Sequence, residues 1–129
     1  MTAATASENV LVDSSGWLEY LTGDAKEALF APYLESETPV LLPTVVLYEV
    51  RKVLFSQQGK SAADSFFSEA LKHILLPFDE ILAVAAVTLS IHHKLSMADA
   101  IIYATAQRHQ AQLITSDQHF AGLRDVVLL

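Results

Sequence analysis

The segment Asn9-Val10-Leu11-Val12-Asp13, NVLVD in one-letter code, decides the fold class of this chain. It is a short apolar run rich in β-branched residues, which predicts a strand, and a helical pattern over residues 14–22 follows it and ends at Gly23. Strands that are apolar throughout, rather than alternating with polar residues, are typical of parallel sheets covered on both faces. The segment therefore indicates an α/β fold.

The alternation of strand and helix continues along the rest of the sequence. Further strands are expected at residues 40–42, 74–76, 112–115 and 126–128. Helices are expected at residues 25–34, 44 to about 56, 61–73, 80 to about 94 and 96 to about 109. The pattern predicts a three-layer α/β/α fold with a central parallel sheet of four to five strands.

Length and composition favour a single domain at residues 9–129, preceded by a flexible polar tail at residues 1–8. The 129 residues suffice for one hydrophobic core, and 52% of them are hydrophobic while 18% are charged. Cysteine is absent, which excludes disulfides, thiolate zinc sites and cysteine nucleophiles. The first ten residues lack the pattern of a secretory signal, and the longest apolar run, residues 81–87, is far shorter than the roughly 20 residues that span a bilayer. We therefore expect a cytoplasmic protein with no membrane association.

The net charge of −7, from 15 acidic and 8 basic residues, limits the possible partners. Proteins that bind nucleic acid by electrostatics alone are normally basic, so passive DNA binding is disfavoured. A nucleic-acid enzyme is compatible with this charge if bound cations neutralise its acidic residues. A basic protein partner is also compatible.

Four carboxylates follow predicted strands or lie in the helices after them, at positions that a parallel sheet would bring together. Asp13 and Asp117 follow predicted strands, Asp99 lies three residues after Ser96 at a helix start, and Glu49 borders the apolar stripe of its helix. Each has a structural explanation as well: Asp13 as a helix cap, Asp117 in an Asx turn, Asp99 in a capping box and Glu49 as a surface charge. Taken together they are expected around one crevice at the carboxyl ends of the strands.

A cluster of four carboxylates requires a cation. At an effective dielectric constant of about 20, two carboxylates about 5 Å apart repel each other by about 3 kcal/mol. Oxygen ligands favour Mg²⁺, with Mn²⁺ as the alternative. The sequence therefore predicts a divalent metal site.

At these residues the sequence resembles the PIN domain family, and in particular the VapC-type toxin ribonucleases of toxin–antitoxin pairs. The resemblance covers nearly the whole chain and rests on Asp13-Ser14 after the first strand, the helical Glu49, the run D-A-I-I-Y-A-T-A at residues 99–106, Thr115-Ser116-Asp117, and Phe120. The run at residues 99–106 is its most specific part.

The resemblance implies a PIN-like fold and a Mg²⁺-dependent endoribonuclease that hydrolyses RNA phosphodiesters as the toxin of a type II toxin–antitoxin system. It implies a cognate antitoxin and a homodimer. The residues implied are Asp13, Glu49, Asp99 and Asp117 as catalytic metal ligands, with the hydroxyls of Ser14 and Thr115 in support.

The sequence departs from the family pattern at His119, because many relatives carry another acidic residue two positions after the strand-end aspartate. A second metal ligand at this position is therefore in doubt. His119 could instead contact a phosphate, act as an acid, or simply belong to a turn.

Other classes of protein fit the sequence less well. A PIN nuclease of RNA processing and an inert PIN-like scaffold share the same motifs, although the presence of all four acids disfavours the scaffold. A receiver-like signalling domain would need an acidic pair near Asp13 and a lysine after the fifth strand, which are missing. A haloacid dehalogenase would need Asp-x-Asp where this chain has Asp13-Ser14-Ser15.

Overall fold

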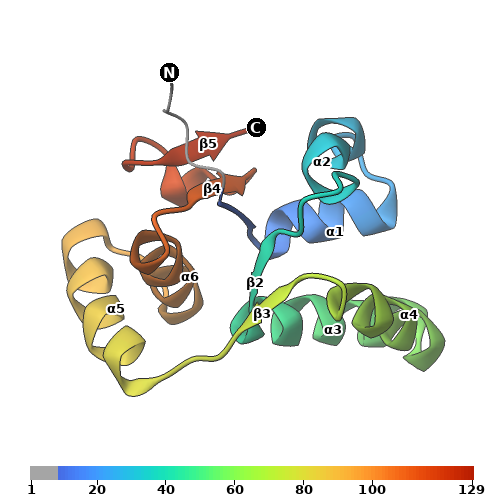
Figure 1. The fold of residues 1–129 in the computed structure, drawn as a ribbon, viewed down its shortest axis with the longest axis horizontal. Coiled ribbons are helices and arrows are strands. Elements are labelled where there is room, and N and C mark those ends of the chain that lie inside the picture. Colours follow the sequence, from blue (N-terminus) through green and yellow to red (C-terminus); the bar gives the residue numbers. More distant parts are fainter. Residues whose placement is uncertain (1–8) are drawn as a thin grey trace.

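The computed structural model describes residues 9–129, so the tail predicted at residues 1–8 lies outside the described part of the chain. A parallel sheet in the order β3-β2-β1-β4-β5 runs through the centre of the molecule (Figure 1). Its strands are β1 (Val10–Val12), β2 (Leu41–Pro43), β3 (Ile74–Leu76), β4 (Gln112–Thr115) and β5 (Val126–Leu128). All four strand pairs are parallel, which confirms the sheet predicted from the apolar strands.

Helices cover both faces of this sheet. The first four are α1 (Ser14–Thr22), α2 (Glu27–Leu34), α3 (Thr44–Gln58) and α4 (Lys60–Ala70). They lie on one side, whereas α5 (Glu80–His93) and α6 (Met97–Arg108) lie on the other (Figure 1). A short 3₁₀ helix, η1 (Gln118–Phe120), follows β4. The predicted α/β/α layering is thereby confirmed.

The strand order excludes the receiver-like alternative. A receiver domain has the order 2-1-3-4-5, in which the third strand lies directly beside the first. Here β1 lies between β2 and β4, and β3 is an edge strand. The chain therefore has a different topology from a receiver, despite the similar length and acidic edge.

Several element boundaries differ from the prediction by a few residues, and the differences in α2, β2 and α4 have local reasons. Helix α2 begins at Glu27 rather than at residue 25, because the Glu27 amide donates to the Asp24 carbonyl in a turn. Strand β2 begins and ends one residue later than predicted, because Pro43 pairs with Leu76 of β3. Helix α4 ends at residue 70 rather than 73, because His73 turns towards the sheet.

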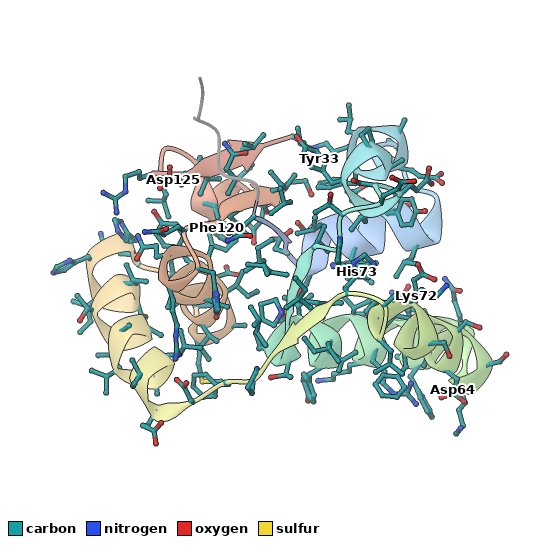
Figure 2. The ribbon with its side chains drawn as sticks, in the orientation of Figure 1. Tyr33, Asp64, Lys72, His73, Phe120 and Asp125 are labelled. Carbon is teal, nitrogen blue, oxygen red and sulfur yellow. The ribbon has the colours of Figure 1, made fainter. Side chains whose placement is uncertain are left out.

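His73 illustrates how packing overrides the helical pattern. Its Nδ1 accepts a hydrogen bond from the Val40 amide at 3.1 Å, and its ring meets the Trp17 ring edge-on with centroids 5.3 Å apart. The side chain lies between α1 and β3 (Figure 2). Trp17 also packs edge-on against Phe66 of α4, so aromatic contacts join α1, α4 and the sheet.

Helix α6 is the most buried helix of the described residues. Every residue from Ala100 to Ala106 is buried, because the sheet lies on one side of the helix and α5 on the other. The apolar run that ends the family motif is thus a core segment, and it holds the first turn of α6 in a fixed position beside the sheet.

None of the helices in residues 9–129 is by itself both long and apolar enough to cross a membrane. Helices α5 and α6 reach the length and apolar composition of a membrane span only when they are taken together, and the pair is bent by 113°.

The contact between α1 and α2 depends on Gly16. A Cβ atom added to Gly16 would lie 2.6 Å from Phe30 Cε1 and 2.6 Å from Val12 Cγ1, and both of these side chains are fully buried. Neither can move without disturbing the core, so the absence of a side chain at this position is a packing requirement.

We expect Gly16→Ala to lower the free energy of unfolding by about 1 to 3 kcal/mol, because the added methyl group overpacks the core. In an unhindered helix the same change would be stabilising by up to about 1 kcal/mol. Urea denaturation followed by circular dichroism measures the difference, with Ser68→Ala on the exposed face of α4 as the control. A Gly16→Ala variant as stable as the wild type would contradict this close packing.

Candidate functional site

The carboxyl ends of β1 and β4 form the switch point of the sheet, the edge at which parallel α/β sheets have their crevice. The connection after β1 leads towards β2 and β3 on one side, whereas β4 and β5 lie on the other. Ligands of parallel α/β sheets bind at such a switch point, outside the carboxyl ends of the two central strands. Asp13 directly follows β1, and Asp117 lies two residues after β4.

Asp13 is the buried centre of this crevice, with 2% of its surface exposed. Its Oδ2 accepts a hydrogen bond from the Thr115 hydroxyl at 2.7 Å, and its Oδ1 accepts from the Ser15 hydroxyl at 2.8 Å and the Gly16 amide at 3.1 Å. The Gly16 contact makes Asp13 the N-cap of α1, as the structural explanation predicted. The cap and a position in the crevice therefore coexist in one residue.

Burial dominates the ionisation of Asp13. It raises the pKa of this carboxyl from 3.8 to about 6, and the negative charge of Asp117 adds to the effect. The hydrogen bonds from Thr115, Ser15 and Gly16 act in the opposite direction, because they stabilise the carboxylate. An ionised Asp13 is therefore costly in the protein alone and would gain from a nearby cation.

Thr115 connects Asp13 to Asp117. Its hydroxyl donates to Asp13 and accepts a hydrogen bond from the Asp117 amide at 2.9 Å. Asp117 Oδ1 in turn accepts from the His119 amide at 2.9 Å, which forms the predicted Asx turn and starts η1. One hydroxyl thus fixes the positions of two acidic residues from different strand ends.

Asp99 reaches the same crevice from the first turn of α6. The Asp99 amide donates to Ser96 Oγ at 3.2 Å, which is the half of the predicted capping box in which Ser96 caps the helix. Only 17% of the Asp99 side chain is exposed. Burial raises the pKa of Asp99, the charges of Asp117 and Glu49 raise it further, and the hydrogen bond with Ser96 and the nearby His119 oppose them.

Glu49 completes the set from α3. It is partly buried, and its Oε1 accepts a hydrogen bond from the Ser14 hydroxyl at 2.6 Å. The prediction that Glu49 borders the buried face of its helix is therefore confirmed. Ser14 links α1 to α3 through this contact, whereas the hydroxyl on Asp13 Oδ1 comes from the next residue, Ser15.

The four predicted acids thus interact electrostatically in pairs. The charge of Asp117 raises the pKa of Asp13, and the charges of Asp117 and Glu49 raise the pKa of Asp99. The tightest grouping within residues 9–129 is Asp99, Asp117 and His119, whose ligand atoms all lie within 4.8 Å of one another. Asp13 interacts electrostatically with Asp117 of this group, and Glu49 interacts with Asp99.

Ser15 is a residue of the site that sequence reasoning missed. Its hydroxyl donates to Asp13 and also meets the Ser116 amide at 3.3 Å and the Ser116 hydroxyl at 3.2 Å. The repeated serines at residues 14 and 15 were the available signal. At the start of a helix, two consecutive side chains point about 100° apart, so each reaches a different carboxylate.

The donor set fits a hard divalent cation. It consists mainly of carboxylate oxygens with hydroxyls beside them, which Mg²⁺ and Mn²⁺ prefer. The raised pKa values of Asp13 and Asp99 have the physical cause that a divalent cation would relieve, namely buried and mutually repelling carboxylates.

Comparison with known proteins assigns the family. The family model described as "PIN domain" matches residues 10–126. This chain therefore belongs to the PIN domain family. Among curated protein sequences, none matches the chain significantly.

Solved structures share the fold over almost the whole chain. A toxin–antitoxin complex from Klebsiella pneumoniae has 26% sequence identity and a TM-score of 0.76, covering 92% of this chain and 96% of that one. VapC20 of Mycobacterium tuberculosis, a sarcin-ricin loop cleaving toxin, has 20% identity and a TM-score of 0.76, covering 90% and 95%. The FitAcB structure from Neisseria gonorrhoeae has 22% identity and a TM-score of 0.72, covering 93% and 96%.

The raised pKa of Asp13 predicts how stability depends on pH. Because this pKa is about 6 in the folded protein and 3.8 for a fully solvated aspartate, the folded state binds the proton more tightly between these values. The contribution of Asp13 to stability is therefore fully present below about pH 4 and is lost as the pH rises through about 6, a change of up to about 3 kcal/mol. Asp13→Asn should lack this loss.

Urea denaturation in the presence of a chelator, between pH 4.5 and 8, measures the effect. We expect the free energy of unfolding of Asp13→Asn to rise relative to that of the wild type as the pH increases. Asp79→Asn is the control: the Leu82 amide and Arg108 lower the pKa of Asp79 below its usual 3.8, so its difference in unfolding free energy from the wild type should stay constant over this pH range. If the difference in the free energy of unfolding between Asp13→Asn and the wild type is the same at every pH, ionisation of Asp13 costs no stability and the prediction is wrong.

Proposed function

We propose that this protein is a Mg²⁺-dependent endoribonuclease and the toxin of a type II toxin–antitoxin system. The observation that carries the proposal is the meeting of Asp13, Glu49, Asp99 and Asp117 at the switch point of a PIN fold. Support comes from the relatives: the protein from Klebsiella pneumoniae was solved as a toxin–antitoxin complex, and VapC20 cleaves the sarcin-ricin loop. A PIN nuclease of RNA processing is the alternative.

The four acids, Asp13, Glu49, Asp99 and Asp117, are the proposed holders of the metal. When bound there, Mg²⁺ or Mn²⁺ would activate water for attack on a phosphodiester and offset the charge that develops on the phosphate oxygens. The hydroxyls of Ser14 and Thr115 support the site by donating to its carboxylates, and the Ser15 hydroxyl does the same.

The protein's own part in the reaction is to hold these carboxylates in place. Thr115 and Ser15 orient both oxygens of Asp13, and Ser14 orients Glu49. Such fixed carboxylates need no reorganisation when the substrate arrives, which is the basis of electrostatic preorganisation. With a net charge of −7, the chain would repel RNA until cations occupy the site.

The charge also supports the proposed antitoxin partner, and the absence of cysteine suits the proposed cytoplasmic location. An arginine- or lysine-rich segment would complement the acidic crevice, and an inhibitor placed there would compete with metal and RNA. RNA targets and a reducing environment suit a cysteine-free chain in the cytoplasm.

Asp99→Asn tests whether the acids act as one metal site. We expect the change to reduce RNA cleavage at least 100-fold and, because it removes like-charge repulsion, to raise the stability of the metal-free protein by about 1 kcal/mol. Mg²⁺ should raise the melting temperature of the wild type clearly and that of the variant much less. Cleavage of a labelled RNA with Mg²⁺ or with excess EDTA, together with thermal unfolding, provides these readouts.

The control is Asp79→Asn, which changes an aspartate at the start of a different helix, where it is the N-cap of α5. It should retain cleavage and the full response to Mg²⁺. Wild-type cleavage that persists in EDTA, or an Asp99→Asn variant that still cuts RNA and gains equally from Mg²⁺, would reject the proposed metal-dependent nuclease.

The proposed homodimer has a suitable surface on α5. Apolar side chains along this helix and around the start of α6 are exposed: Phe78, Ile81, Val84, Val87, Ile91 and Met97. Val84 and Ile91 are each 72% exposed, and a groove of about 340 Å³ runs between α5 and α6 beside them. Contiguous apolar surface of this kind marks interaction sites in proteins.

We expect Val84→Asp to shift the protein from dimer to monomer, because a charge at the centre of an apolar interface would lose its hydration on association. Sedimentation velocity over a range of concentrations measures the equilibrium. Ser68→Asp introduces the same charge on the exposed face of α4, away from this surface, and should leave the dimer unchanged. A wild type that is monomeric at all concentrations would contradict the proposed dimer.

A further inference from the structure

His119 lies at the edge of the acidic crevice, within reach of two carboxylates. Its Nδ1 is 3.0 Å from Asp117 Oδ1 and 3.9 Å from Asp99 Oδ2. The three residues form the group of possible metal ligands found in the described part of the chain. His119 is the one nitrogen donor in that group.

These separations suit ligands of a common ion. Ligand atoms about 2.1 Å from an octahedral ion are about 3 Å apart when adjacent and about 4.2 Å apart when opposite. The distances of 3.0 and 3.9 Å from His119 Nδ1 lie within this range. Small side-chain rotations would therefore suffice for all three residues to bind one cation.

The backbone holds His119 in this position although 76% of its side chain is exposed. Its amide donates to Asp117 Oδ1, and the next residue, Phe120, is fully buried. Phe120 packs against Tyr103 of α6 and lies beside α6 and β4 (Figure 2). Since α6 also carries Asp99, the segment bearing His119 is anchored to the helix that supplies one of the carboxylates.

We infer that His119 is a ligand of the metal bound at this site, and that its imidazole makes the site favour Mn²⁺ over Mg²⁺. The inference rests on the proposed metal site and specifies its chemistry. Imidazole suits transition metals, whereas Mg²⁺ strongly prefers oxygen ligands. An all-carboxylate site would lack this nitrogen contribution to Mn²⁺ binding.

The test measures metal binding directly in tag-free, full-length protein, with MnCl₂ and MgCl₂ as the probes. Bound Mn²⁺ should show ¹⁴N couplings from an imidazole in electron spin-echo spectra, and the couplings should be lost in His119→Ala. Titration should show Mn²⁺ affinity falling about 10-fold or more in His119→Ala, with Mg²⁺ affinity changing less than about threefold. His119→Asp should lower the ratio of Mn²⁺ to Mg²⁺ affinity by supplying an oxygen ligand in place of the nitrogen.

His92→Ala is the matched control, because His92 is exposed on α5. It should keep both the ¹⁴N couplings and the Mn²⁺ affinity. Couplings that persist in His119→Ala, or an unchanged Mn²⁺ to Mg²⁺ affinity ratio, would overturn the inference and leave His119 as a neighbour of Asp117 without a role in metal binding.

The two proposals fail in different ways. If Asp99→Asn abolishes metal binding and cleavage while His119→Ala alters neither the couplings nor the affinity ratio, the nuclease proposal stands and the ligand role of His119 is wrong. If the wild type binds neither Mn²⁺ nor Mg²⁺, both are wrong.

Discussion

The hydrogen bond from the Thr115 hydroxyl to the buried Asp13 carboxylate is the interaction on which the site depends. It joins the ends of β1 and β4, the two strands that meet at the switch point, and Thr115 also receives the Asp117 amide. The sheet therefore does more than support the acids. It buries Asp13 in an environment where a negative charge is costly without a cation, and it fixes Asp117 at the same time.

The structural and functional explanations of these acids are not alternatives. Asp13 caps α1, Asp117 forms the Asx turn of η1, and the helix of Asp99 is capped by Ser96. Helix starts offer backbone N–H groups that hold a carboxylate in one orientation, and in a parallel sheet the helix starts lie beside the carboxyl ends of the strands. The same local structure that stabilises the fold thus gathers negative charge at one edge.

Much of the fold could be predicted because the strands are apolar and are punctuated by clear helix signals. The NVLVD and QLIT segments are strands at the centre of the sheet, and the apolar run after Asp99 is a buried helix, as expected. The end of α4 could not be predicted, because the ring of His73 is held by Trp17 and the Val40 amide, which are distant in sequence.

The residues of the site could be predicted only in part. The approach of the four acids follows from topology, but the contacts of Ser14, Ser15 and His119 depend on side-chain directions in the first turn of a helix, where neighbouring residues diverge by about 100°.

The central claim is that acids from four segments form one divalent metal site. Crystals of the wild-type protein soaked in MnCl₂, with anomalous diffraction collected near the manganese edge, test it most directly. The account predicts an anomalous peak in the crevice with carboxylate oxygens of Asp99 and Asp117 at about 2.1 to 2.3 Å. Manganese bound elsewhere on the protein, with none in this crevice at saturating concentration, would contradict it.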